Sequence, residues 1–367
     1  MVDDEASSDK FTEETTMVDE AKLNAFIGKI LGDLGGAMST PLVRMGDKLG
    51  LYNALKEHGP MTSTELAAKT NVAERYAREW LSNQAASGYL EYDPATVKFT
   101  LPPEQAMVFA EPDSPVYLLP AFDIVAVMLE NQPLVEPAFR TGKGVGWGDQ
   151  SQCLFCTTGR FFRPGYQNNL VSSWLPALDG VTAKLESGAT VADVGCGHGF
   201  STIIMAKAYP KSTFIGYDFH PSSVEQARVH AEQHGATANT KFEVAIAGDF
   251  PGKDLDLVTF FDCLHDMGDP IGAARHVRET LKPDGSWMIV EPAAGDRLED
   301  NLNPVSRMYY AASTMICVPT SLDQPVGAAF GAQAGFAKLS SAITQGGFGA
   351  VRKATETPFN MVLEARP

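Results

Sequence analysis

Three glycines alternate after an acidic residue in the segment Asp193-Val194-Gly195-Cys196-Gly197-His198-Gly199. The apolar run before the glycines predicts a buried strand, and the glycines predict a tight turn into a helix. Glycine lets the backbone adopt positive φ angles and lets a ligand approach it closely, so this turn suits a nucleoside-type cofactor. A dinucleotide-binding turn has the spacing G-x-G-x-x-G, and its third position here is Phe200, a bulky ring. The spacing therefore disfavours an NAD-linked oxidoreductase.

Acidic residues and one histidine stand at or near the ends of strand-like segments. The expected strands are 191–194, 212–217, 242–247, 255–261, 286–290, 350–355 and 360–365. The expected helices between the first five of them are 201–209, 221–234 and 271–281. This alternation predicts an α/β fold with a doubly wound, Rossmann-like parallel sheet, whose ligands bind at the carboxyl ends of the strands. The residues at or near those ends are Asp193, Asp218, Asp249, His265 and Glu291.

A small module at 60–101 predicts a winged helix-turn-helix. A capped helix at 62–69 and a turn precede a second helix at 73–87, and two short strands surround Asp93-Pro94. Such a module binds DNA with its second helix or serves as a protein–protein interface. It carries four basic and five acidic residues, and this balance is unsuited to neutralising phosphates. We therefore favour the protein interface.

Composition narrows the possible classes of protein. The 367 residues allow two domains, and a net charge of −16 argues against broad binding to nucleic acid or to anionic membranes. No apolar run approaches the ~20 residues that span a bilayer. The acidic N-terminus is unlike a secretory or transit peptide, and the odd number of cysteines does not suggest a disulfide framework, so we expect a cytoplasmic protein. Cys153 and Cys156 lack a second ligand pair, and no metal site is expected.

These motifs resemble those of the class I S-adenosylmethionine (SAM)-dependent methyltransferases with an N-terminal winged-helix dimerisation domain. That family includes plant-type and bacterial small-molecule O-methyltransferases, and the likeness covers roughly residues 22–365. It implies SAM as the cofactor, a small-molecule acceptor and a homodimer formed through the N-terminal domain. The expected domains are a disordered acidic tail at 1–20, a mainly α winged-helix dimerisation domain at 21–110, a helical linker and lid at 111–180, and a SAM-binding domain at 181–367 with an insertion near 294–335.

The resemblance also implies roles for individual residues. His265 would be the general base for a hydroxyl acceptor, with Asp266 beside it and Glu291 orienting its ring. The alternative for His265 is a loop residue that only shapes the pocket wall. Asp218 would bind the ribose and Asp249 the adenine amino group, whereas Asp193 could instead only cap the glycine turn. The expected cofactor-binding residues are Asp193, Gly195, Gly197, Gly199, Asp218, Phe219, Gly248, Asp249, Phe250 and Asp262.

One departure from the family pattern leaves the acceptor open. Plant-type members carry a second acid on the helix before the final Gly-Phe turn, but this chain has no Asp or Glu from 324 to 355. N-, S- or carboxyl-methylation by proximity therefore stays an alternative to O-methylation, and a SAM-sensing transcriptional regulator is an alternative of another class. Apolar residues outside the sheet could line the pockets or form interfaces: Phe161, Phe162, Tyr166, Met308, Tyr309, Tyr310, Met315 and Ile316.

Overall fold

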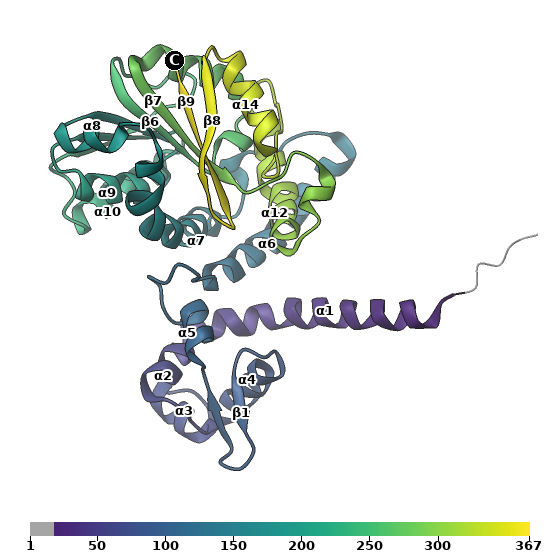
Figure 1. Cartoon of the computed structure of the whole chain (residues 1–367). Helices are drawn as coiled ribbons and strands as arrows, with labels where there is room; N and C mark the ends of the chain where they lie inside the picture. Colours follow the sequence, from purple (N-terminus) through teal and green to yellow (C-terminus); the bar gives the residue numbers. More distant parts are fainter. Residues whose placement is uncertain (1–17) are drawn as a thin grey trace, which may run out of the picture.

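The N-terminal part of the chain is helical and ends in a small hairpin (Figure 1). A computed structural model describes residues 18–367, so most of the tail expected at 1–20 lies outside the described residues. The elements of this part are α1 (Glu20–Lys48), α2 (Leu51–His58), α3 (Ser63–Thr70), α4 (Glu74–Ala86), β1 (Glu91–Asp93), β2 (Lys98–Thr100) and α5 (Pro103–Phe109). Their order confirms the winged helix-turn-helix. α3 begins with the expected capping box, in which Thr62 and Glu65 bond each other's backbone N–H groups.

α1 has two halves with different surroundings. Its C-terminal half is fixed to the rest of the molecule, because the Trp80 indole N–H of α4 donates to the Leu42 carbonyl at 2.8 Å and Asp123 accepts a bond from Arg44 at 2.7 Å. Its N-terminal end projects away from both domains (Figure 1), whereas Asp33 near the middle accepts a bond from Arg307 of the C-terminal part at 3.0 Å. The large apolar side chains exposed along α1 from 23 to 38 are Leu23, Phe26, Ile27, Ile30, Leu31, Leu34 and Met38.

A second helical layer connects this part to the sheet. Its elements are α6 (Leu119–Thr141), η1 (Trp147–Asp149), α7 (Cys153–Asn169), η2 (Leu170–Trp174), η3 (Leu175–Ala177) and α8 (Val181–Ser187). Arg160 of α7 donates to Asp123 of α6 at 3.1 Å and to Asp47 of α1 at 3.0 Å. These bonds hold three helices together beside the carboxyl edge of the sheet.

The C-terminal part is a seven-stranded sheet in the order β5-β4-β3-β6-β7-β9-β8. Its strands are β3 (Thr190–Val194), β4 (Thr213–Asp218), β5 (Thr240–Val244), β6 (Leu255–Phe261), β7 (Leu281–Pro292), β8 (Ala350–Glu356) and β9 (Asn360–Arg366). The first five are parallel, and β9 runs antiparallel to both of its neighbours. This topology confirms the Rossmann-like methyltransferase sheet.

Both faces of the sheet are covered, as the near-continuous apolar strands require. Trp287 and Ile289 pack in one core, whereas Met288 and Val290 pack in the other, because successive side chains of a strand point to opposite faces. The helices and short turns of this part are α9 (Phe200–Ala208), α10 (Pro221–Gln233), η4 (Leu264–Asp266), α11 (Pro270–Thr280), η5 (Leu298–Asn301), α12 (Pro304–Ala312), η6 (Ser313–Cys317), α13 (Val318–Asp323) and α14 (Gly335–Gln345).

Two strand boundaries differ from the expected ones by three residues or more. β5 ends at Val244, which pairs with Asp218 at the end of β4, so residues 245–247 have no neighbour to extend the strand and form a loop. β7 begins at Leu281 rather than 286, because Leu281 pairs with Leu255 across an irregularity in the ladder. Among the described residues, no helix has the length and apolar character that crossing a membrane requires.

Candidate functional site

The glycine turn connects β3 to α9 at the carboxyl edge of the sheet. Gly195 has φ +75°, and a Cβ there would lie 2.8 Å from the Cys263 sulfur. Gly199 has φ +78°, and a Cβ there would meet the Phe242 ring at 2.8 Å. Side chains are therefore excluded for two reasons, the backbone conformation and close packing against the following βα units. Gly195 and Gly197 line a groove of about 130 Å³, whereas Gly199 faces the interior of the domain.

Asp193 is buried below this turn. Its carboxylate accepts hydrogen bonds from the hydroxyls of Ser201 at 2.7 Å, Thr202 at 2.5 Å and Thr259 at 3.0 Å. Burial raises the pKa of Asp193, although the three hydroxyl donors oppose the shift. The carboxylate thus ties the start of α9 to β6, and the structure does not bring it into either cavity that borders the glycine turn.

Asp218 stands at the end of β4 on the wall of the same groove. It accepts the N–H of Gly197 at 2.9 Å and the N–H of His220 at 2.9 Å. Burial raises the pKa of this carboxyl group against the effect of the two backbone donors. A carboxylate has about four acceptor sites, so Asp218 retains capacity to accept bonds from the hydroxyls of a ligand.

A second cavity of about 530 Å³ continues on the other side of Gly195. Phe219 and Gly248, two of the expected cofactor-binding residues, line it. Asp249 is exposed on the adjoining loop and does not line it. The structure does not bring Phe250, another expected cofactor-binding residue, to this cavity, because it is 1% exposed and its ring packs on Tyr217 and His276 in the core. The loop that follows β5 turns this ring inward as the chain enters β6.

His265 lies in η4, directly after β6, and is 3% exposed. Its Nδ1 lies 2.6 Å from Oε2 of Glu291, at the end of the neighbouring strand β7. The other oxygen of Glu291 accepts the N–H of Leu264 at 2.9 Å, which fixes the carboxylate. Burial favours the neutral imidazole, but the carboxylate of Glu291 and the Cys317 sulfur raise the pKa of His265 well above its usual range. The pair therefore orients the ring so that Nε2 points away from the sheet.

Asp262 and Asp266 stand where two cavities meet. Both line the groove beside the glycine turn and also a larger cavity of about 520 Å³. The Asp262 carboxylate accepts bonds from the Asn360 amide at 2.9 Å and the Tyr166 hydroxyl at 3.4 Å. Burial raises the pKa of Asp266 to about 7, and the positive charge of His265 opposes this shift.

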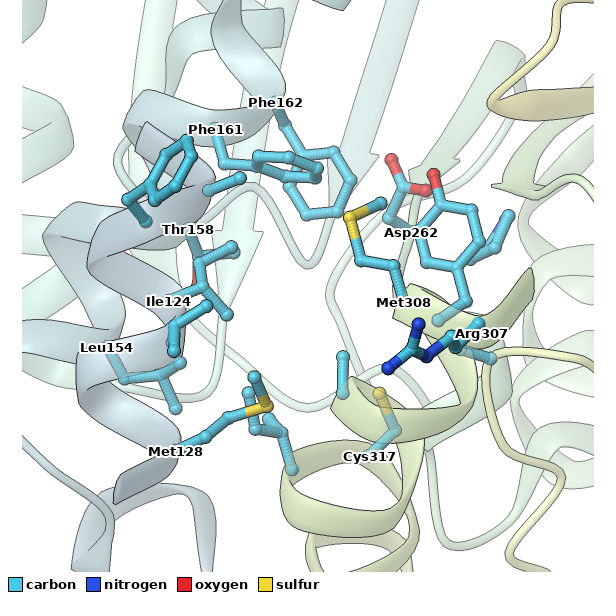
Figure 2. Close-up of a pocket in the computed structure, with 18 of the residues that line it drawn as sticks. Ile124, Met128, Leu154, Thr158, Phe161, Phe162, Asp262, Arg307, Met308 and Cys317 are labelled. Carbon is cyan, nitrogen blue, oxygen red and sulfur yellow. The ribbon is translucent and has the colours of Figure 1, made fainter. Parts of the chain in front are cut away.

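The cavity of about 520 Å³ that His265 lines lies between the helical layer and the insertion (Figure 2). Ile124, Leu154 and Phe161 contribute one apolar wall, and Met308 and Cys317 approach from the other side (Figure 2). His265 and Arg307 are among its few polar groups. Of the apolar residues singled out in the insertion, Met308, Tyr309 and Ile316 line the cavity, whereas Tyr310 and Met315 do not. Phe162 borders both the groove and the large cavity, and Tyr166 borders the groove.

No sequence motif pointed to Cys317 as a residue of the site. Its sulfur lies 3.3 Å from Nε2 of His265, on the side of the ring opposite Glu291. Cys317 ends η6, a π-helical segment far from His265 in the chain, so only the fold brings the two together. Trp147 and Phe155 also border the groove from the helical layer without a distinguishing motif.

Comparisons with known proteins agree with this architecture. Residues 185–344 match the family described as a methyltransferase domain, and residues 37–111 match a Rv2258c-like winged helix-turn-helix domain. Ubiquinone biosynthesis O-methyltransferases of Xanthomonas euvesicatoria and Cereibacter sphaeroides are 34% and 33% identical over 115 and 98 residues. These stretches cover 30% and 27% of this chain and 47% and 39% of the other proteins. The chain thus spans less than half the length of these relatives.

Solved structures share the fold over nearly the whole chain. Mitomycin 7-O-methyltransferase MmcR has a TM-score of 0.68 at 18% identity, covering 95% of this chain and 100% of that one. Human N-acetylserotonin methyltransferase in complex with SAM has a TM-score of 0.67 at 17% identity, covering 96% and 99%. At these identities the likeness concerns the arrangement of both domains.

Proposed function

We propose that this chain, a methyltransferase-domain protein with an N-terminal winged helix-turn-helix domain, transfers a methyl group from SAM to a hydroxyl of a small-molecule acceptor. His265 acts as the general base in this proposal. The observation that carries it is the position of His265: a buried imidazole, oriented by Glu291 at 2.6 Å, on the wall of an apolar cavity that adjoins the glycine-turn groove.

The residues around the glycine turn fit SAM. The turn leaves the space beside Gly195 without a side chain, and the Asp218 carboxylate on the groove wall suits a ribose diol. Phe219 and Gly248 border the adjoining cavity, where a flat adenine ring can lie on an apolar surface. When bound, SAM supplies a methyl group on a sulfonium, which is already an excellent leaving group. The protein therefore has to align the acceptor and exclude water rather than activate the donor.

Proton removal is the step that needs His265. Glu291 accepts a hydrogen bond from Nδ1–H, which leaves the Nε2 lone pair to take the proton of an acceptor hydroxyl. The Cys317 thiol occupies that side of the ring, so the acceptor has to replace it at Nε2. The apolar walls of the cavity favour an acceptor with a large apolar surface and keep water from competing.

A binding and transfer experiment tests the function. We expect SAM and S-adenosylhomocysteine, but not NAD, to bind in calorimetry. Labelled SAM should then pass its methyl group to a member of a panel of phenols, hydroxy acids and amines. Tighter binding of NAD than of SAM would overturn the proposal, and transfer only to amines would favour methylation by proximity over base catalysis.

We also propose that the protein forms a homodimer through its N-terminal domain. The exposed apolar face of α1 has no partner among the described residues, and an obligate dimer buries upwards of ~2,000 Å². The alternative, DNA binding, is unsupported by α4, where Arg78 bonds Glu74 at 2.8 Å and Arg75 bonds Glu79 at 2.5 Å. These pairs leave little free positive charge for phosphates.

Light scattering on an α1 variant tests the dimer. Phe26→Asp places a charge on the exposed face, toward the N-terminus from Gly32, the first residue of α1 that lines the acceptor cavity, and should yield a monomer at micromolar concentration. Leu302→Asp is a matched control, because Leu302 is also exposed but lies outside the N-terminal domain. A wild-type protein that is monomeric, or a Phe26→Asp variant that still dimerises, would contradict this interface.

A further inference from the structure

We infer that His265, Asp266 and Cys317 form a binding site for a zinc-class divalent cation at the junction of the two cavities. Each of these residues offers one ligand atom, and the three atoms lie within 4.8 Å of one another. They supply an imidazole nitrogen, a carboxylate oxygen and a thiol sulfur. This mixture suits zinc, whereas magnesium and calcium prefer all-oxygen sites.

The distances already approach those of a tetrahedral site. Bonds of about 2.1 Å to nitrogen and 2.3 Å to sulfur place two ligand atoms about 3.6 Å apart around zinc. Nε2 of His265 and Sγ of Cys317 are 3.3 Å apart, so a cation between them needs only a small outward shift. Asp266 follows His265 in η4, and its side chain makes no hydrogen bond to another residue in the described range. Its carboxylate is therefore free to turn inward.

The surroundings prepare the imidazole for a metal. Metal-bound histidines commonly donate their other ring N–H to a carboxylate, which fixes the tautomer. Glu291 occupies that position at Nδ1, at 2.6 Å, and its own second oxygen is held by a backbone N–H. The lone pair of Nε2 is thereby directed at the Cys317 sulfur. Cys317 ends a π-helical segment, an irregularity that aims its side chain at η4.

Three protein ligands leave a fourth position open toward the acceptor cavity, because all three residues line it. The Cys317 thiol must release its proton to solvent for the sulfur to bind, so affinity should rise with pH. A bound cation occupies the Nε2 lone pair that proton removal requires. We therefore expect the metal to inhibit methyl transfer reversibly. The binding itself does not depend on the proposed function, whereas the inhibition does.

Cys153 and Cys156 are a pair of thiols outside the proposed site, exposed at the start of α7. Two thiols without further ligands make a weak, solvent-exposed site, and Cys156 already donates to the Cys153 carbonyl. The double variant Cys153→Ser/Cys156→Ser is therefore the matched control for thiol chemistry outside the proposed site.

Titration with cobalt(II) detects metal binding at the site without an activity assay, because a thiolate bound to cobalt gives a charge-transfer absorption band. We expect this band at one equivalent in the full-length protein and in Cys153→Ser/Cys156→Ser, and its displacement by zinc. Cys317→Ser should lose the band, and Asp266→Asn should weaken cobalt binding by about 10-fold or more. Circular dichroism and thermal unfolding check that each variant is folded. A band that survives in Cys317→Ser, or vanishes in the double variant, would overturn the site.

Methyl transfer then tests the inhibition. Zinc should abolish the activity of the wild-type protein and of the double variant, and a chelator should restore it. Activation by zinc would overturn the inhibitory role while leaving the binding result standing. If no acceptor is found, the cobalt titration still decides whether the site exists.

Discussion

The two cavities that meet at Asp262 and Asp266 are built in different ways. The floor of the groove beside the glycine turn comes from consecutive βα units, with Asp218 held by two backbone N–H groups, and aromatic side chains of the helical layer such as Trp147 and Phe155 border it. The acceptor cavity combines α1 and the helical layer with α12 and η6 of the insertion, three regions that are far apart in the sequence. This difference suggests that cofactor binding and acceptor chemistry can be altered separately.

The largest effect on activity is expected from a substitution in the acceptor cavity. His265→Ala should lower turnover by about 10²–10⁴-fold, because the acceptor hydroxyl loses its base. SAM affinity should barely change, since the residues proposed to hold SAM lie at the end of β4 and in the loops that follow β3, β4 and β5. Initial rates and calorimetry with one preparation check both statements. His234→Ala, at the end of α10, is the control and should keep its activity.

A His265→Ala enzyme with near-normal turnover on a good acceptor would show that the base assignment is wrong. Loss of SAM binding together with turnover would instead mean that the histidine supports both cavities, and the proposed separation between them would fail.

A substitution in the groove proposed to bind SAM should lower the affinity for SAM. Asp218→Ala should weaken SAM binding by about 1–3 kcal/mol, through loss of charge-assisted bonds to the ribose. Asp256→Ala is a matched control, because Asp256 also accepts a backbone N–H, that of Thr190 at 2.9 Å, but at the start of β6 on the opposite edge of the sheet. Calorimetry with equal losses in both variants would attribute the effect to folding rather than to the ligand.

A smaller effect on turnover is expected when Glu291, whose carboxylate bonds His265, is replaced. Burial lowers the pKa of His265, but Glu291 outweighs it and raises the pKa well above the usual range. The base acts in its neutral form, so turnover should rise with pH into the alkaline range. Glu291→Gln removes the charge, which should shift this rise to lower pH and reduce the plateau by about 10-fold through poorer orientation of the ring. A pH–rate profile that keeps its position in the variant would contradict the pairing.

The same difference between the cavities explains what the sequence could predict. The glycine spacing, the strand-end acids and the capping box are local patterns, and they predicted the sheet, the winged helix and the surroundings of Gly195, Asp218 and His265. Cys317 could not be predicted, because its contact with Nε2 depends on how η6 packs against η4. The buried position of Phe250 could not be predicted either, because an aromatic residue beside a loop acid looks the same in sequence whether it faces a ligand or the core.

The smallest effect is expected for Asp249, where the sequence prediction and the observed geometry differ. The family resemblance implies that Asp249 contacts the adenine amino group, yet this side chain is exposed and lies outside the adjoining cavity. A solvent-exposed hydrogen bond contributes about 0.5–1 kcal/mol, so Asp249→Ala should weaken SAM binding only about 2–5-fold in calorimetry. Phe219→Ala, which removes a ring that lines the cavity, is the comparison. A loss above 10-fold for Asp249→Ala would mean that the loop 245–249 folds over the nucleoside when it binds. The cofactor side would then depend on ligand-induced movement as well as on the rigid ends of its strands.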